Sequence, residues 1–464
     1  MNTLRSQVAR TIRRSSRRNS KIRWACLAGY LCFVDSPGET ALAEECQFLS
    51  SKPQNEFRVG SPPVNIQPYG TPDGQWPPRM TPWWYRLTGP LRDKALRKQK
   101  IIRVEVQGLE HLTHSLSSNH GVMLTPNHSF HWDSYCLVSA ADKLRMPFYI
   151  MTAWQVFAMS SWFERHSMQR CGCFSVDREG ADVQAMKTAV DILQNKQHPL
   201  LIFPEGDVYH MNDRVTAFRD GAAAIALLAA RKSTRPISII PVAIKRWYTQ
   251  DPTPSLLRTI ERLEKRLYWR PQSELPLADR VLHVARGLLS LKEMEHLRVT
   301  QTGSLSARVE RLSSAILVAC ESRYGLQAKQ LLIPERVKEV RRAIIGAGES
   351  EAGVASAALK KQWSNDMESM FLVTQLYSYP GNYLEENPSI ERMAETLDKL
   401  EEDALDAAYP TVHAEREVLV RFDQPIVLPS GKEKRVAPAE LTDQLEQRVQ
   451  TMLNEMNAQR TRHN

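Results

Sequence analysis

The sequence predicts an α/β fold: a mainly parallel sheet flanked by helices, with a large all-helical insertion. Short apolar runs alternate with helical patterns between Gly121 and Ile244, and this alternation indicates βαβ units around a parallel sheet. Residues 251–414 then carry helical periodicity alone. Strand character returns at Glu417–Gly431, before a final helical stretch, and we expect this strand to complete the sheet.

The first 75 of the 464 residues are expected to form a basic arm and a disordered linker. Arginines precede the apolar run "WACLAGYLCFV", which is too short to span a bilayer. The following "ALAEE" resembles a cleavage site, so an N-terminal signal peptide is an alternative to the arm. No later segment has the 18 consecutive apolar residues typical of a transmembrane helix.

Two segments are rich in aromatic residues that could either pack inward or face a membrane. Residues 76–103 hold eight basic residues against one acid, with Trp83, Trp84 and Tyr85 among them. This suits a membrane interface, but also a surface helix whose aromatic rings pack inward. A second stripe runs from Trp154 to Trp162 at helical spacing. It predicts a helix packed on the core, or alternatively an acyl groove or membrane-facing helix.

The remaining elements follow in order along the chain. We expect an α/β domain over residues 76–250, a helical insertion over 251–414, and a returning strand and helix over 415–464. The expected buried strands are Gly121–Thr125, Met146–Thr152, Cys171–Asp177, Pro199–Pro204 and Ile237–Ile244, and the helices between them are Val183–Lys196 and Gly221–Ser233.

Charge and cysteine content narrow the class of protein. The net charge of +9 favours an anionic partner, such as nucleic acid, an anionic membrane or a phosphorylated ligand, without choosing among them. The seven cysteines show no C-x-x-C spacing, so neither a disulfide framework nor a zinc ribbon is predicted. This cysteine usage fits a reducing compartment.

The stretch "LTPNHSFHWDSY" carries the densest candidate chemistry. His128 and Asp133 are five residues apart, and on one continuous helix they would lie about 140° apart and not meet. A loop that leads into a helix starting near Asp133 would let the carboxylate reach the imidazole. The carboxylate would then hold one ring nitrogen and leave the other free to take a proton from a hydroxyl.

A metal site is the rival interpretation of the same stretch. His128 and His131 are three residues apart and share a helical face, so with Asp133 or Cys136 they could bind zinc. No second ligand cluster with motif spacing follows in the sequence.

Two later motifs end apolar strands, where open parallel sheets bind ligands. "FPEGD" offers Glu205 as a hydrogen-bond acceptor and Gly206 as a residue that tolerates positive φ; alone, it also fits a plain turn. "FSVDREG" offers Arg178, whose planar fork of donors suits a phosphate. A salt bridge from Arg178 to a carboxylate is the alternative.

The order of these motifs resembles the glycerolipid acyltransferase family, which includes the 1-acylglycerol-3-phosphate acyltransferases. N-H-x-x-x-x-D at Asn127–Asp133, V-D-R at Val176–Arg178, F-P-E-G at Phe203–Gly206 and I-P-V-A-I at Ile240–Ile244 appear in the family's order. The resemblance covers about Met123 to Ile244.

The resemblance implies a function and a role for each residue. His128 is expected to be the general base and Asp133 to orient it, while Arg178, Glu205 and Gly206 bind the acceptor. The donor would be an acyl thioester of coenzyme A or acyl carrier protein, and the acceptor a lipid. No metal, other cofactor or nucleic acid is expected, and the protein would associate peripherally with the cytoplasmic face of a membrane.

One departure concerns the acceptor. The family usually continues F-P-E-G with T-R-S, whereas this chain reads Asp207-Val208-Tyr209, so an acid replaces a pattern that supplies a second arginine. Arg214 or Arg219 is the candidate replacement. Two alternatives to the acyltransferase are a lipid-binding scaffold without activity and a metal-dependent hydrolase that uses His128, His131 and Asp133.

Overall fold

The computed structural model describes residue 72 and residues 74–461, except 179–181, 328–330, 352–354, 406, 408 and 432–435. The predicted basic arm, apolar run and cleavage-like sequence therefore lie outside the described residues. Within the described part of the chain, no helix is both long and apolar enough to cross a membrane. Four cysteines in this part, Cys136, Cys171, Cys173 and Cys320, are free thiols.

The core of the fold is an eight-stranded sheet in the order β1-β7-β6-β2-β5-β3-β4, with β8 also paired to β6. Adjacent strands run parallel except that β6 is antiparallel to β7 and β8. The predicted mainly parallel α/β sheet is thus confirmed. The strands are β1 Ile101–Gln107, β2 Gly121–Pro126, β3 Tyr149–Ala153, β4 Cys173–Val176, β5 Leu200–Leu201, β6 Ile237–Tyr248, β7 Arg416–Phe422 and β8 Ile426–Leu428.

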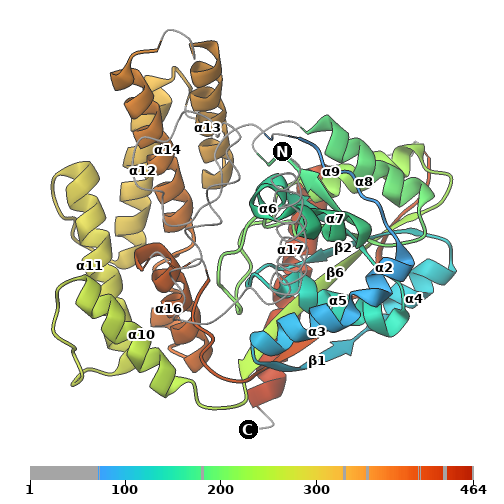
Figure 1. Cartoon of the computed structure of the whole chain (residues 1–464), viewed down its shortest axis with the longest axis horizontal. Helices are drawn as coiled ribbons and strands as arrows, with labels where there is room; N and C mark the ends of the chain where they lie inside the picture. Colours follow the sequence, from blue (N-terminus) through green and yellow to red (C-terminus); the bar gives the residue numbers. More distant parts are fainter. Residues whose placement is uncertain are drawn as a thin grey trace, which may run out of the picture. The chain divides into compact units, whose positions relative to one another are not determined.

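Helices cover both faces of the sheet (Figure 1). One apolar core joins the sheet to α8, α9 and α17, and a second core on the other face joins it to α3, α4 and α5. Each face of a parallel sheet needs such cover because its strands are apolar on both sides. The helices of this region are α2 Pro82–Leu87, α3 Gly89–Lys98, α4 Leu109–Ser117, α5 Asp133–Leu144, α6 Trp154–Met159, α7 Trp162–Arg170, α8 Val183–Asn195, α9 Gly221–Lys232 and α17 Pro438–Thr461.

Between β6 and β7 the chain is helical, as the periodicity predicts, and we call this segment the helical block. It has two apolar cores of its own, one over α11 to α14 and one over α10, α11 and α16. The chain then returns to the sheet, where β7 lies between β1 and β6. The block contains α10 Thr253–Arg266, α11 Leu277–Leu297, α12 Leu305–Arg323, α13 Ile333–Ser350, α14 Ala357–Tyr377, α15 Tyr383–Glu386 and α16 Ile390–Ala404.

The largest differences from the expected strand lengths occur in β5 and β6. The run Pro199–Pro204 yields only the two residues of β5, because the chain leaves the sheet to form the turn at Phe203–Gly206. β6 extends beyond Ile244 to Tyr248, because β7 pairs with this extension. β1 has no counterpart among the expected strands, since its sequence IIRVEVQ belongs to a segment dominated by basic residues.

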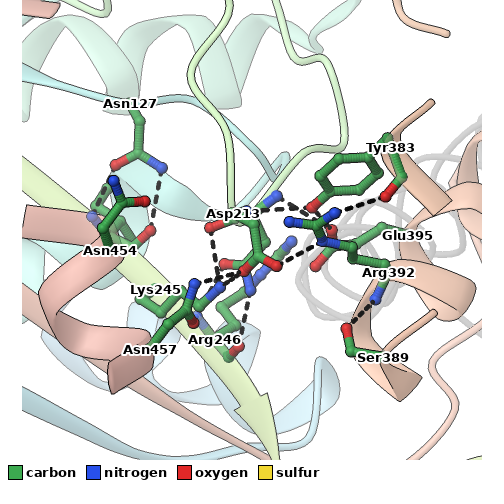
Figure 2. A network of polar contacts seen from close by, with 12 residues as sticks. Asn127, Asp213, Lys245, Arg246, Tyr383, Ser389, Arg392, Glu395, Asn454 and Asn457 are labelled. Atoms are coloured by element: carbon green, nitrogen blue, oxygen red, sulfur yellow. Dashed lines mark hydrogen bonds and ion pairs between the residues drawn. The ribbon is translucent and has the colours of Figure 1, made fainter. Parts of the chain in front are cut away.

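A buried polar network joins the helical block to the sheet (Figure 2). Asp213, in the segment after β5, forms ion pairs with Lys245 of β6 and with Arg392 of α16. Glu395 of α16 accepts hydrogen bonds from the Tyr383 hydroxyl at 2.7 Å and from the Asn212 backbone N–H at 3.1 Å. Burial lowers the pKa of Lys245 to about 8. Removing one partner of such a buried ion pair leaves an uncompensated charge, so these contacts hold the two regions together.

Candidate active site

The site begins where β2 ends, at the carboxyl edge of the sheet. All six residues of β2 are buried, and the next residue, Asn127, is also buried. Its side-chain amide donates to the Ile244 carbonyl at 3.0 Å, and its Oδ1 accepts from the Ile244 N–H at 2.7 Å. The side chain of Asn127 therefore replaces backbone pairing with β6 and lets the main chain turn away into the loop of residues 127–132.

This loop folds back so that His128 and Asp133 meet. Asp133 is the first residue of α5 and is fully buried. Its Oδ2 accepts from the backbone N–H groups of Ser129 and Phe130, each at 2.8 Å, and lies 3.2 Å from His128 Nδ1. A carboxylate at a helix N-terminus is favoured by the helix dipole. The carboxylate therefore fixes both the loop and the imidazole ring.

The imidazole of His128 is held in one orientation but remains accessible. It stacks on Phe203, with ring centroids 4.0 Å apart and planes 24° apart. The carboxylate holds Nδ1, so that nitrogen carries the proton in the neutral ring. No hydrogen bond joins Nε2 to a described residue, and 18% of the side chain is exposed. Nε2 is thus the nitrogen that can accept a proton from an incoming group.

Glu205 joins the first loop to the third motif. It is buried; its Oε1 accepts from the His128 backbone N–H at 2.6 Å and its Oε2 from the Thr216 N–H at 3.0 Å. Burial raises the pKa of Glu205 to about 8, although these hydrogen bonds act to lower it. Both oxygens are engaged by the protein's own backbone, so the geometry gives Glu205 a part in positioning His128. The predicted contact of Glu205 with an acceptor stays a prediction.

Gly206 provides a close contact that no other residue would allow. Its φ is +79°, and a Cβ at this position would lie 2.8 Å from Arg219 Nε. Its carbonyl accepts a hydrogen bond of 2.5 Å from Arg178 Nη1. The turn thereby brings two arginines to the sheet edge beside His128.

Asp207, the residue that departs from the family pattern, lies between these arginines. Its Oδ2 is 3.4 Å from Arg178 Nη1, which realises the salt bridge considered for Arg178. Burial alone would raise the pKa of Asp207, but Arg178, the Val208 N–H and Arg219 together lower it. Arg219 also lies 4.0 Å from Glu335 of α13, so two carboxylates lie beside the two guanidinium groups.

The two candidate replacement arginines have different surroundings. Arg219 contacts Gly206 at the site, although it also lies 4.0 Å from Glu335 of α13. Arg214 pairs with Glu386 at 2.5 Å and with Asn382 at 3.0 Å, and both partners belong to the helical block. Of the two, Arg219 is therefore the one that can act beside Arg178.

The rest of the departing segment contacts the helical block. Tyr209 is buried and its ring meets Tyr377 of α14 edge to face, with centroids 5.6 Å apart. His210 Nε2 lies 3.0 Å from Glu402 Oε2 of α16. Tyr209, one of the residues that replace the family's T-R-S, and the adjacent His210 therefore contact this block. Nothing in the local sequence signals partners that lie more than 160 residues away.

The structure does not assemble the metal ligands considered from the sequence. His131 Nε2 lies 2.8 Å from Glu402 Oε1, so its ring faces the helical block while His128 faces Asp133. Cys136 is fully buried in the core. Within the described residues, the group of converging metal-ligating side chains is His131, His210 and Glu402.

Fold and site together define an α/β domain with a histidine–aspartate pair and two arginines at the carboxyl edge of a parallel sheet. In a comparison with protein families, the model of the Acyltransferase family matches residues 103–245. The matched family is that of the glycerolipid acyltransferases, and the match supports an acyltransferase activity in general. The comparison with curated proteins finds no match.

Proposed function

We propose that this protein transfers a fatty acyl group from an acyl-CoA or acyl carrier protein thioester to a hydroxyl of a glycerol-phosphate or lysophospholipid-like acceptor. The single observation that carries the proposal is the pairing of His128 Nδ1 with Asp133 Oδ2 at 3.2 Å, inside a domain of the acyltransferase family. A base oriented by a buried carboxylate, with its other nitrogen accessible, is suited to activating a hydroxyl.

In the proposed reaction, His128 Nε2 takes the proton from the acceptor hydroxyl as the oxygen attacks the thioester carbonyl. The tetrahedral intermediate collapses, the carbon–sulfur bond breaks, and the thiolate leaves with the proton that His128 returns. Asp133 stabilises the imidazolium between the two steps and holds the ring in place. The acyl group passes directly from sulfur to oxygen, so no acyl-enzyme and no cofactor is required.

Arg178 and Arg219 are the proposed contacts for a phosphate on the acceptor. A guanidinium matches the geometry of phosphate oxygens, and Gly206 contacts both side chains, since Arg178 donates to its carbonyl and Arg219 packs where a Cβ would lie. Asp207 and Glu335 oppose the charges of the two arginines, so the proposed site favours a monoanionic phosphodiester, as in a lysophospholipid, over a dianionic phosphate.

Peripheral attachment to the cytoplasmic face of a membrane is part of the proposal. α2 packs on α7, where Trp84 Nε1 donates to Ser167 Oγ at 3.1 Å. Large apolar side chains of these helices remain exposed: Trp83 by 58%, Leu87 by 64% and Trp162 by 75%. Aromatic and leucine side chains beside the basic residues of this segment are suited to the interface of an anionic bilayer.

The enzymatic proposal is tested by incubating purified protein with radiolabelled acyl-CoA or acyl carrier protein and a panel of hydroxyl acceptors, followed by lipid extraction. We expect a labelled lipid with at least one acceptor, and its loss in His128→Ala. Full activity of His128→Ala would overturn the assignment of the base. Vesicle binding without transfer from any thioester would instead support the scaffold, and hydrolysis abolished by chelator would support the metal-dependent hydrolase.

The membrane proposal is tested by vesicle sedimentation with anionic and zwitterionic lipids. We expect Trp83→Ala combined with Trp162→Ala to weaken binding to anionic vesicles. Tyr268→Ala is a matched control, because Tyr268 is 99% exposed and lies after α10. Equal loss in both proteins would show that exposed aromatic area alone, and not the α2–α7 surface, mediates binding.

A further inference from the structure

Three side chains from distant parts of the chain converge beside the site but take no part in the proposed reaction. His131 comes from the loop after β2, His210 from the segment after β5, and Glu402 from α16. The two Nε2 atoms lie 2.8 Å and 3.0 Å from different oxygens of the same carboxylate. The ligand atoms all lie within 4.8 Å of one another.

The charges of this cluster favour the binding of a cation. Glu402 and His210 are both buried, and the ion pairs of the carboxylate are those with the two histidines. An ionised carboxylate that is buried in this way has to be paired with a positive charge. With neutral imidazoles the cluster holds an uncompensated negative charge away from water, which is unfavourable.

The backbone holds His210 in place for this contact. Its φ is +53°, a left-handed conformation that side chains with a Cβ adopt only at an energetic cost. Such a conformation persists where surrounding contacts impose it. His210 belongs to the segment that departs from the family pattern, so the cluster is a feature of this chain and not of the matched family motifs.

The distances suit a small ion with nitrogen and oxygen ligands. Zinc binds imidazole nitrogen and carboxylate oxygen at about 2.0–2.2 Å, so tetrahedral ligand atoms lie roughly 3.4 Å apart. The observed separations, which are 4.8 Å or less, need to change by at most about 1.4 Å to reach this arrangement. The side chain of His131 is 28% exposed, which leaves a path for the ion and a fourth position for water.

We propose that His131, His210 and Glu402 bind one divalent transition-metal ion, with zinc as the ion that fits best. The ion would cross-link two loops of the active site to α16 of the helical block, without contact with the reacting atoms. This inference goes beyond the proposed acyl transfer, and it departs from the expectation, drawn from the family resemblance, that the protein contains no metal.

The test uses the full-length protein, freed of metal with chelator and titrated with Zn²⁺ in a calorimeter, with the content of zinc measured after dialysis. We expect one equivalent of zinc per chain. His210→Ala and Glu402→Gln should each weaken binding by more than about 100-fold, because even the loss of a group that only supports a ligand costs 10–100-fold. His296→Ala is the matched control, since His296 lies 4.0 Å from Glu295 without a second histidine, and its titration should equal that of the wild type.

A second measurement, of thermal unfolding, is used in case His210→Ala or Glu402→Gln folds poorly. His131 is the most exposed of the three ligands, with 28% of its side chain exposed. Zinc should raise the midpoint of thermal unfolding of the wild type but not of His131→Ala. Absence of stoichiometric binding by the wild type would overturn the proposal, as would equal affinity in His210→Ala and the wild type. In either case the three side chains would form hydrogen bonds with one another and bind no metal. These results are independent of acyl transfer, so they separate failure of the metal site from failure of the proposed reaction.

Discussion

His128 and His131 are three residues apart in one loop, yet their surroundings differ in almost every respect. His128 meets a carboxylate five residues along the chain, at the start of the next helix. His131 meets a carboxylate 271 residues along the chain, on a helix of the block inserted between β6 and β7. The first pair depends on local geometry, and the second exists only because a distant segment docks. One short motif thus serves a reaction centre on one side and an interface on the other.

The largest expected effect is a difference in the rate of acyl transfer between variants of His128 and His131. We expect His128→Ala to lower kcat for acyl transfer by about 10²–10⁴-fold, because a positioned general base contributes that much. His131→Ala should lower kcat by less than about tenfold, since His131 acts only through the position of the loop. Initial rates with saturating thioester and acceptor measure both variants. Equal losses would mean that the comparison between a reaction centre and an interface is wrong.

The next effect concerns the interface that His131 belongs to. Asp213→Ala removes the partner of both Lys245 and Arg392, so we expect the free energy of unfolding to fall by about 3–5 kcal/mol. Denaturant titration followed by circular dichroism measures this change. Glu295→Ala removes a partner of exposed Lys292 and should cost at most about 1 kcal/mol. Similar values for the two variants would show that the buried network does not hold the block in place.

A smaller effect is expected for Arg178, the proposed phosphate contact beside His128. Arg178→Ala should lower kcat/KM for a phosphate-bearing acceptor by about 10–150-fold, which corresponds to the 1.5–3 kcal/mol of a charged hydrogen bond. An acceptor without phosphate should be affected much less. Arg214→Ala is the control, because Arg214 pairs with residues of the helical block. If both arginine variants lose phosphate preference equally, the anion site is not confined to the sheet edge.

The smallest effect is the pH dependence contributed by Glu205. Its folded-state pKa of about 8 lies above the ordinary value of 4.5, so between these pH values the folded protein binds more protons than the unfolded chain. Stability must then fall as pH rises through this window. Glu205→Gln should flatten the fall by at most about 1.4 kcal/mol per pH unit, measured as unfolding free energy at several pH values. An unchanged slope would show that Glu205 is ionised throughout.

Much of the sheet domain could be predicted because its signals are local. Buried strands such as Gly121–Pro126 and the helix at Val183–Asn195 appear within one or two residues of their expected positions. The meeting of His128 and Asp133 follows from the position at which α5 starts, which the sequence allowed us to anticipate. β1 was missed although Ile102 to Gln107 alternate between apolar and polar residues, because the strand directly follows a segment dominated by basic residues.

Contacts between distant segments could not be predicted in this way. Periodicity identifies α16 as an amphipathic helix, but it does not say that Glu402 faces two histidines of the sheet domain. The same holds for Asp207: the sequence shows an acid where an arginine is usual, and only the structure shows Arg178 and Arg219 around it. Pairings across large sequence separations depend on packing that a single sequence does not reveal.

The position of β7 has a consequence for the order in which the protein is made. β1 pairs with the sheet through β7 alone, and 308 residues separate Gln107 from Arg416. At a rate of synthesis of about 5–20 residues per second on the ribosome, β7 is made roughly 15–60 seconds after β1. Throughout that time, one edge of β6 and the whole of β1 are unpaired and open to other chains. A segment cut to residues 103–245 would keep that exposed edge permanently, so it would be more prone to pair with other chains than the full-length protein.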